Sequence, residues 1–262
     1  MDIRKSKYIL PNLFTLASVF FGVLAVASCM EGTDQGFRRA AIAILVAMVA
    51  DSLDGRVARM TRTATRFGIQ LDSLADVVSF GMAPAAVAYF FALHSLDGAK
   101  GLLGAFIAFL WVACGALRLA RFNVMADGDE KPGGWFIGLP IPAAAGILAL
   151  FVWVATDLGF SDRVRLLSLS AGMPSLALLM VSTLPYRSFK RVRMGLLRRI
   201  GLIAMVAGVI WVAIETRASA VLLVLGSSYI LLGPLEWLVK LPFRLKRRRS
   251  ERTDKNDVPD ND

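Results

Sequence analysis

The stretch that decides the fold is "AAIAILVAMVADSLDGRVARMTRTATRFGIQLDSLADVVSFGMAPAAVAYFFAL", residues 40–93. Two apolar runs flank a polar segment, and this order predicts two membrane-spanning helices joined by a short turn. Four aspartates lie near the borders between the apolar runs and the polar segment: Asp51, Asp54, Asp72 and Asp76. Ionisable side chains within membrane helices are costly, so these four residues indicate a functional site.

The composition supports a membrane protein. The chain has 262 residues, 56% of them hydrophobic, which is more apolar surface than one soluble core can hide. Several runs exceed the roughly 20 residues that a helix needs to cross a bilayer. Because the runs are continuous and do not alternate, they favour helices over barrel strands. We therefore predict an all-α integral membrane protein.

Eight apolar segments are long enough to be read as membrane spans. They cover about residues 9–29, 38–60, 69–94, 99–121, 139–157, 164–184, 200–215 and 218–239. We interpret the first segment as a spanning helix because it is too long for a signal peptide. The organisation predicted from these segments is a six-helix catalytic domain over 1–195, two additional transmembrane helices over 196–240, and a cytoplasmic tail over 241–262 that is first basic and then polar.

The distribution of positive charge predicts the orientation. With the N-terminus inside, the inner loops and the two termini hold 24 of the 30 Lys and Arg residues, and the outer loops hold 6. Both termini and the aspartates are thus expected on the cytoplasmic side. The net charge of +10 is explained by these loops without a nucleic-acid partner. The basic part of the tail is expected to lie against membrane lipids.

The spacing of the aspartates brings them onto shared helix faces. Asp51 and Asp54 are three residues apart, and Asp72 and Asp76 are four apart, so each pair lies on one side of its helix. Four converging carboxylates repel one another unless they take up protons or bind a divalent metal. All-oxygen ligation suits Mg²⁺ or Mn²⁺, and two such ions suit displacement at phosphorus. The alternatives are solvated helix caps or an ion pair with arginine.

The same stretch carries a recognisable pattern, D-x2-D-G-x2-A-R-x8-G-x3-D-x3-D over residues 51–76. It resembles the signature of the CDP-alcohol phosphatidyltransferases, with every position filled. The resemblance implies a six-helix membrane core, commonly dimeric, with a two-metal site that opens to the cytoplasm. Members of this family displace CMP from a CDP-linked lipid or alcohol by attack of a second alcohol.

The resemblance also implies roles for individual residues. The metal ligands would be Asp51, Asp54, Asp72 and Asp76, and Asp76 would also be the catalytic base that takes the acceptor's proton. The residues implied for binding CDP-diacylglycerol are Asn12, Thr15, Asp54, Gly55, Ala58, Arg59, Thr65 and Gly68.

Five further stretches are similar to the serine-using bacterial members of the family: residues 10–22, 71–85, 116–124, 138–146 and 181–194, the last with Tyr186 and Arg187 where smaller or hydroxylated residues are expected. This similarity implies transfer of the phosphatidyl group from CDP-diacylglycerol to the hydroxyl of L-serine. It also implies a bacterial inner (cytoplasmic) membrane and a homodimer. Serine needs a cation for its carboxylate and an acceptor for its ammonium group. The residues that we expect around it are Ser79, Phe80, Gly81, Arg118, Arg121 and Asn123.

Two alternatives remain open at this point. The acceptor could be another alcohol, such as glycerol 3-phosphate, an inositol compound or choline. A member of a different class, an ion-coupled transporter, could use the aspartates as a proton relay, although such proteins place acidic groups near the membrane midplane. Finally, the five tryptophans, Trp111 and Trp153 among them, are expected to be interfacial anchors or to face lipid.

Overall fold

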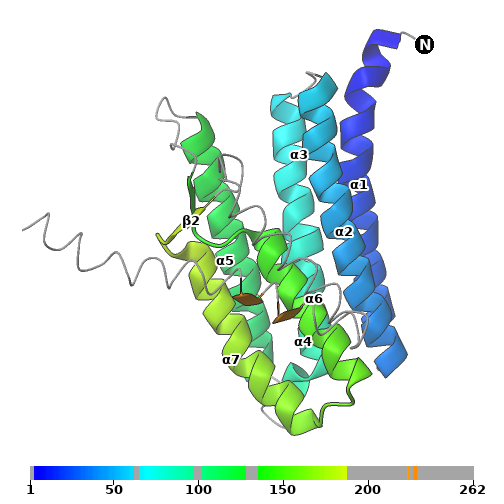
Figure 1. The fold of residues 1–262 in the computed structure, drawn as a ribbon, viewed down its shortest axis with the longest axis vertical. Helices are drawn as coiled ribbons and strands as arrows, with labels where there is room; N and C mark the ends of the chain where they lie inside the picture. The colour runs from blue at the N-terminus through cyan, green and yellow to red at the C-terminus, as the bar shows by residue number, and fades with distance from the viewer. Residues whose placement is uncertain are drawn as a thin grey trace, which may run out of the picture.

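The computed structural model describes residues 3–61, 65–96, 102–127 and 135–187, together with residues 223, 224, 227 and 228. Within these residues the chain folds into six helical rods (Figure 1). They are α1 (Ile3–Cys29), α2 (Asp34–Thr61), a third rod of α3 (Arg66–Asp76), η1 (Val77–Met82) and α4 (Ala83–Phe91), then α5 (Leu102–Asp127), α6 (Ile141–Asp157) and α7 (Asp162–Val181). A short 3₁₀ turn, η2 (Leu93–Ser95), follows the third rod.

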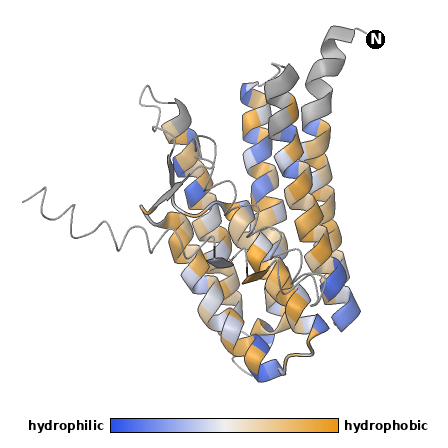
Figure 2. Cartoon of the chain, viewed as in Figure 1, coloured by the Kyte–Doolittle hydropathy of each residue, from blue (hydrophilic) through white to orange (hydrophobic). Residues whose placement is uncertain are grey.

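The six rods coincide with the first six predicted spans. Four helical stretches of the described chain are long and apolar enough to cross a membrane: 12–29, 66–91, 102–125 and 162–181. The apolar helix α6 is shorter, and α2 carries charged residues at both ends of its apolar centre. Figure 2 shows apolar residues along the helices and hydrophilic residues gathered near their ends. The chain is therefore an integral membrane protein, and the predicted spans 200–215 and 218–239 fall outside the described residues except for the four named above.

Figure 1 shows how the helices are arranged. The start of α1, the end of α2, the start of α3 and the end of α5 lie at the same end of the molecule. The connection between α6 and α7 lies at the opposite end. Helix α1 packs against α2 along much of its length, and α5 packs against α7. The aspartates lie on α2 and α3, two helices that follow one another in the sequence.

Small residues let the helices approach closely. The centre of the bundle is rich in fully buried alanines, including Ala25, Ala40 and Ala144. At Gly22 in α1, a Cβ atom would lie 2.9 Å from the Cα of Ser79 in η1. At Gly115 in α5, it would lie 2.4 Å from the Cδ1 of Ile141. Such contacts are typical of membrane bundles, in which packing of small residues replaces the hydrophobic drive between helices.

The third rod contains a π-helical turn that we did not predict. Around η1 the backbone hydrogen bonds lengthen to five residues; Ala83, which follows it, donates to the carbonyl of Val78. Pro84, the second residue after η1, has no N–H to donate, so the carbonyls one turn before it lack their usual donor. The indole Nε1–H of Trp111 in α5 donates to one of these, the carbonyl of Phe80, at 3.1 Å. Trp111 is fully buried, so the expectation that it faces lipid or the interface is wrong.

A two-stranded ribbon joins α6 to the end of α7. Strands β1 (Trp135–Ile137) and β2 (Pro185–Arg187) pair antiparallel, and they are the only strands in the described part of the chain. Gly138 follows β1 with a φ of +79°, and a Cβ there would lie 2.4 Å from the carbonyl oxygen of Met180. Only glycine fits this left-handed turn against the last residues of α7.

Candidate active site

The start of α3 is fixed by a local cap. The hydroxyl of Thr65 accepts a hydrogen bond from the backbone N–H of Gly68 at 3.0 Å. This is the usual N-cap of a helix, and it sets where α3 begins after the polar turn. A Cβ at Gly68 would lie 3.2 Å from the Thr65 hydroxyl and 3.6 Å from the Asn12 side-chain oxygen. The start of α3, the cap and α1 therefore meet at one point, one turn before Asp72.

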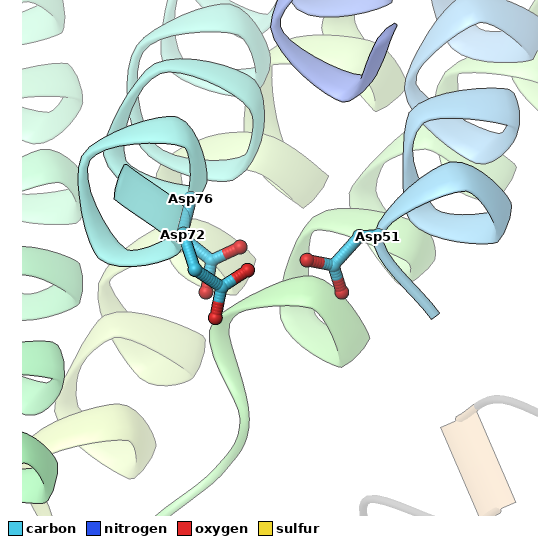
Figure 3. A group of neighbouring side chains, drawn as sticks. All are labelled: Asp51, Asp72 and Asp76. Carbon is cyan, nitrogen blue, oxygen red and sulfur yellow. The ribbon is translucent and has the colours of Figure 1, made fainter. Parts of the chain in front are cut away.

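Three of the four predicted aspartates converge. Asp51 projects from α2 toward Asp72 and Asp76 on α3 (Figure 3). One carboxylate oxygen of each residue lies within 4.8 Å of the others. The charge of Asp51 also acts on Asp76 across the two helices. The four-residue spacing of Asp72 and Asp76 thus has the predicted result, and Asp51 joins them from α2.

Asp54 lies beside the three-carboxylate group but points to a different partner. It is buried, with 7% of its surface exposed, and its Oδ2 accepts a hydrogen bond from the Thr15 hydroxyl at 2.8 Å. Its charge acts on both Asp51 and Asp72, so the four acids form one electrostatic cluster. Thr15 of α1, which the sequence also singled out, is therefore connected to this cluster through Asp54.

Asp51, Asp72 and Asp76 have no basic partner in direct contact among the residues that the structure describes. Within the described residues, no Lys or Arg forms a salt bridge with Asp51, Asp72 or Asp76. Arg118 of α5 is the nearest candidate; its charge acts on Asp76, and only 8% of its surface is exposed. The alternative that these aspartates are simple ion pairs is therefore not supported.

Unsatisfied polar atoms surround Asp76. In the part of the chain that the structure describes, four side-chain atoms are buried without a hydrogen-bond partner: Asp76 Oδ1, Ser79 Oγ and Arg118 Nε, together with Trp153 Nε1 on α6. Buried polar groups are normally paired, because leaving one unpaired costs about 1–3 kcal/mol. Atoms left unpaired at one place indicate that a ligand or an ion completes their bonding.

The donor set fits a divalent cation. Three carboxylate oxygens within 4.8 Å of one another are hard ligands without a matching positive charge. Their arrangement suits Mg²⁺ or Mn²⁺ better than zinc, since no His or Cys belongs to the group. The cluster can therefore hold a metal ion, and its carboxylates would lose their mutual repulsion when it does.

The other predicted site residues differ in their surroundings, and not all of them face the aspartates. Phe80 has no exposed surface and packs in the hydrophobic core, and a Cβ added at Gly81 would make ordinary contacts with Val77 and Val112. Asn123 donates from Nδ2 to the Ser73 hydroxyl at 2.9 Å, which ties α5 to α3. Gly55, Ala58 and Arg59 lie on the last turns of α2, but their surroundings fall outside the described part of the chain.

Arg121 has a partner that the sequence did not indicate. Its guanidinium donates to the carbonyls of Val181 at 2.9 Å and Ser182 at 3.1 Å. These carbonyls belong to the end of α7, where a helix leaves acceptors unpaired and favours a positive charge. Arg121 therefore clamps α5 to the C-terminal end of α7.

Two features of the site were missed from the sequence: the π-helical turn and the role of Trp111. Pro84, four residues after Phe80, was the available signal, because a proline inside an apolar span leaves a carbonyl without its donor. π-Helical turns occur frequently at functional sites, and η1 begins directly after Asp76.

Comparison with known proteins agrees with this geometry. The family model for CDP-alcohol phosphatidyltransferase matches residues 8–182, which include all six described rods from Tyr8 onward. The chain belongs to this family and is an enzyme of this class.

Relatives in several organisms have names that refer to serine. A protein of Helicobacter pylori named CDP-diacylglycerol–serine O-phosphatidyltransferase is 35% identical over 231 residues, covering 88% of this chain and 92% of the relative. A protein of the same name from Mycobacterium bovis is 38% identical over 150 residues, covering 54% of this chain and 49% of the relative. An archaetidylserine synthase of Methanothermobacter thermautotrophicus is 36% identical over 179 residues, covering 68% and 69% respectively.

Proposed function

We propose that this enzyme transfers the phosphatidyl group of CDP-diacylglycerol to the hydroxyl of L-serine and releases CMP. The observation that carries the proposal is the aspartate cluster, in which three carboxylates from α2 and α3 meet within 4.8 Å in a chain of this family. The choice of serine is supported by the names of the relatives, which all contain serine although the lipid named differs.

The metal ligands in this proposal are Asp51, Asp54, Asp72 and Asp76. Asp51, Asp72 and Asp76 would share one ion, and Asp54, whose charge acts on Asp51 and Asp72, would contribute to a second. Two divalent ions, Mg²⁺ or Mn²⁺, would neutralise the pyrophosphate and lower the pKa of the attacking hydroxyl. The hydrogen bond from Thr15 would orient the Asp54 carboxylate for this task.

Asp76 is proposed as the general base. The serine hydroxyl gives its proton to Asp76 while its oxygen forms a bond to the phosphorus that carries diacylglycerol. The bond between this phosphorus and the bridging oxygen breaks, and CMP leaves with the electron pair. The position of Asp76 supports this role, because its Oδ1 is buried without a partner beside Ser79 and Arg118.

The donor is proposed to bind along α1, α2 and the start of α3. The direct contacts would come from Asn12, Asp54, Gly55, Ala58 and Arg59. Thr65 and Gly68 would act by fixing the start of α3, because their hydrogen bond already serves as the helix cap. Thr15 would act through Asp54.

The serine site is proposed to centre on Arg118. Its guanidinium is nearly buried, carries an unpaired Nε and acts electrostatically on Asp76, so a carboxylate bound here would lie beside the proposed base. Ser79 would contribute its unpaired hydroxyl. Arg121 and Asn123 would support the site by holding α7 and α3 against α5. Phe80 and Gly81 would form its apolar floor.

The wider organisation is also part of the proposal. We place the site and both termini on the cytoplasmic side of a bacterial inner membrane, following the excess of Lys and Arg in the inner loops. The catalytic unit would be residues 1–195, followed by two transmembrane helices and a cytoplasmic tail. A homodimer is the assembly that we expect in the membrane.

An acceptor panel tests the proposal. Purified enzyme with CDP-diacylglycerol and Mg²⁺ or Mn²⁺ receives serine, glycerol 3-phosphate, inositol or choline, and CMP release is measured. We expect serine to give the highest kcat/KM, by about 100-fold, because a site that binds both charged groups rejects acceptors that lack one of them. A preference for another alcohol would overturn the choice of serine and leave the chemistry intact.

A further inference from the structure

We propose that Trp111 is a positioning residue that holds the π-helical turn η1, and through it Asp76, in the arrangement that the reaction needs. The inference rests on the proposed function for its catalytic part. The hydrogen bond that carries it joins the Nε1 of Trp111 to the carbonyl oxygen of Phe80 at 3.1 Å, and both residues have no exposed surface.

The local chemistry explains why a donor is needed there. In an α-helix the carbonyl of Phe80 would accept from the N–H of residue 84, which is proline. The π turn shifts the neighbouring bonds, as in the bond from Ala83 to Val78. Phe80 has no exposed surface, so water does not replace the missing donor and an unpaired carbonyl there is unfavourable. The indole of Trp111 supplies the missing donor from another helix.

The turn is held on two sides. Trp111 contacts it from α5, and Gly22 contacts it from α1, where a Cβ would lie 2.9 Å from the Cα of Ser79. Asp76 is the residue immediately before η1, and Ser79 lies within it. The direction of the Asp76 carboxylate therefore depends on a turn whose shape is maintained by Trp111 and by the close approach of α1.

The rod would be less well defined without this bond. A helix with a proline and an extra residue in one turn can pair its backbone in more than one way. Without the indole donor, η1 can exchange among these backbone hydrogen-bond patterns. Each pattern places α3, which carries Asp72 and Asp76, at a different rotation relative to α4. The expected consequence is a looser metal cluster and a base that spends less time in reach of the acceptor.

The test compares Trp111→Phe with Trp153→Phe. Both changes remove an indole N–H and keep an aromatic ring, but in the described structure the Nε1 of Trp153 is buried without a partner. Backbone hydrogen exchange over residues 76–86 is measured by mass spectrometry in metal-free protein. We expect exchange to be about 10-fold faster in Trp111→Phe and unchanged in Trp153→Phe, because only the first loses a buried hydrogen bond.

The catalytic consequence is read in the same variants. For Trp111→Phe we expect kcat to fall about 10-fold and the Mn²⁺ concentration for half-maximal activity to rise, with the KM for CDP-diacylglycerol within about 2-fold of wild type. Normal exchange over residues 76–86 in a folded Trp111→Phe protein would overturn the proposal, whatever the acceptor proves to be. Faster exchange with unchanged kcat would limit Trp111 to stability and overturn its positioning role.

A measurement on the wild-type fold covers the case in which Trp111→Phe does not fold. The indole N–H resonance of Trp111 is assigned by elimination with Trp→Phe variants at the other four tryptophans. We expect this proton to exchange with solvent about 100-fold more slowly than an interfacial indole. Rapid exchange would contradict the hydrogen bond and the proposal with it.

Discussion

At the residue scale, the four aspartates are alike in sequence but differ in their surroundings. Asp54 accepts a hydrogen bond from Thr15 and is buried, whereas Asp51 and Asp72 are half-buried and face the same space. Asp76 lies deepest of these three and has one oxygen without a partner. Position in the cluster, not residue type, is therefore what assigns each carboxylate its proposed task.

The base assignment gives the first prediction. Asp76→Asn keeps the size of the side chain and removes its ability to accept a proton, so kcat is expected to fall by about 1,000-fold or more. CMP release from CDP-diacylglycerol and serine measures it. The matched control is Asp34→Asn, because Asp34 is an exposed carboxylate in α2 paired with Arg165.

The control is expected to keep near-normal turnover, and both variants should elute as folded protein in detergent. If Asp76→Asn releases CMP at more than about a tenth of the wild-type rate, proton acceptance by Asp76 is wrong.

At the element scale, the close contact between α1 and η1 gives the second prediction. A Cβ at Gly22 would lie 2.9 Å from a backbone atom of Ser79, which cannot move without shifting the rod. Gly22→Ala is therefore expected to destabilise the protein by about 1–3 kcal/mol. Gly172→Ala on α7 is the control, since a Cβ there meets nothing within 4 Å.

Equilibrium unfolding in mixed detergent micelles measures both variants. Equal stability of Gly22→Ala and Gly172→Ala would show that α1 and η1 do not pack as closely as described.

The clamp between α5 and α7 gives the third prediction. Arg121 reaches the carbonyls of Val181 and Ser182 with two nitrogens, and a single ammonium group replaces such a fork poorly. Arg121→Lys is expected to lower stability by about 1–2 kcal/mol and to leave the KM for serine within about 2-fold. Arg118→Lys is the comparison, with an expected rise in the KM for serine of about 10-fold.

Unfolding curves and serine titrations separate the two arginines. A large rise in the KM for serine in Arg121→Lys, at unchanged stability, would show that Arg121 binds serine and does not act as a clamp.

The elements also show what the sequence can predict. The lengths of the apolar runs and the spacing of the aspartates are local properties. The first six of the eight predicted spans coincide with helical rods, and Asp72 and Asp76 share a face as expected. The partners of Trp111 and Arg121 lie 31 and 60 residues away, and they depend on how helices pack. A helix that is apolar on all sides does not reveal which side faces lipid, which is why Trp111 was misplaced.

At the scale of the whole molecule, one group of helices brings the aspartates together and another group supports them. Alanines and glycines bring α1, α2 and the third rod close together, and this proximity forces acidic side chains from adjacent helices into one group. Helices α5 and α7 support the group from the other side through Trp111 and Arg121. The chain thus concentrates negative charge within a protein that is otherwise strongly basic, with a net charge of +10.

Such a cluster is unfavourable unless a cation completes it, and this is the central claim. Three unscreened carboxylates in a partly buried site repel one another, and a divalent ion removes that cost. The measurement that tests it most directly is CMP release by purified enzyme after exhaustive chelation and after readdition of Mg²⁺ or Mn²⁺. The account predicts that chelation removes at least about 99% of the activity and that adding Mg²⁺, Mn²⁺ or both restores it fully. Full activity in the chelated protein would contradict it.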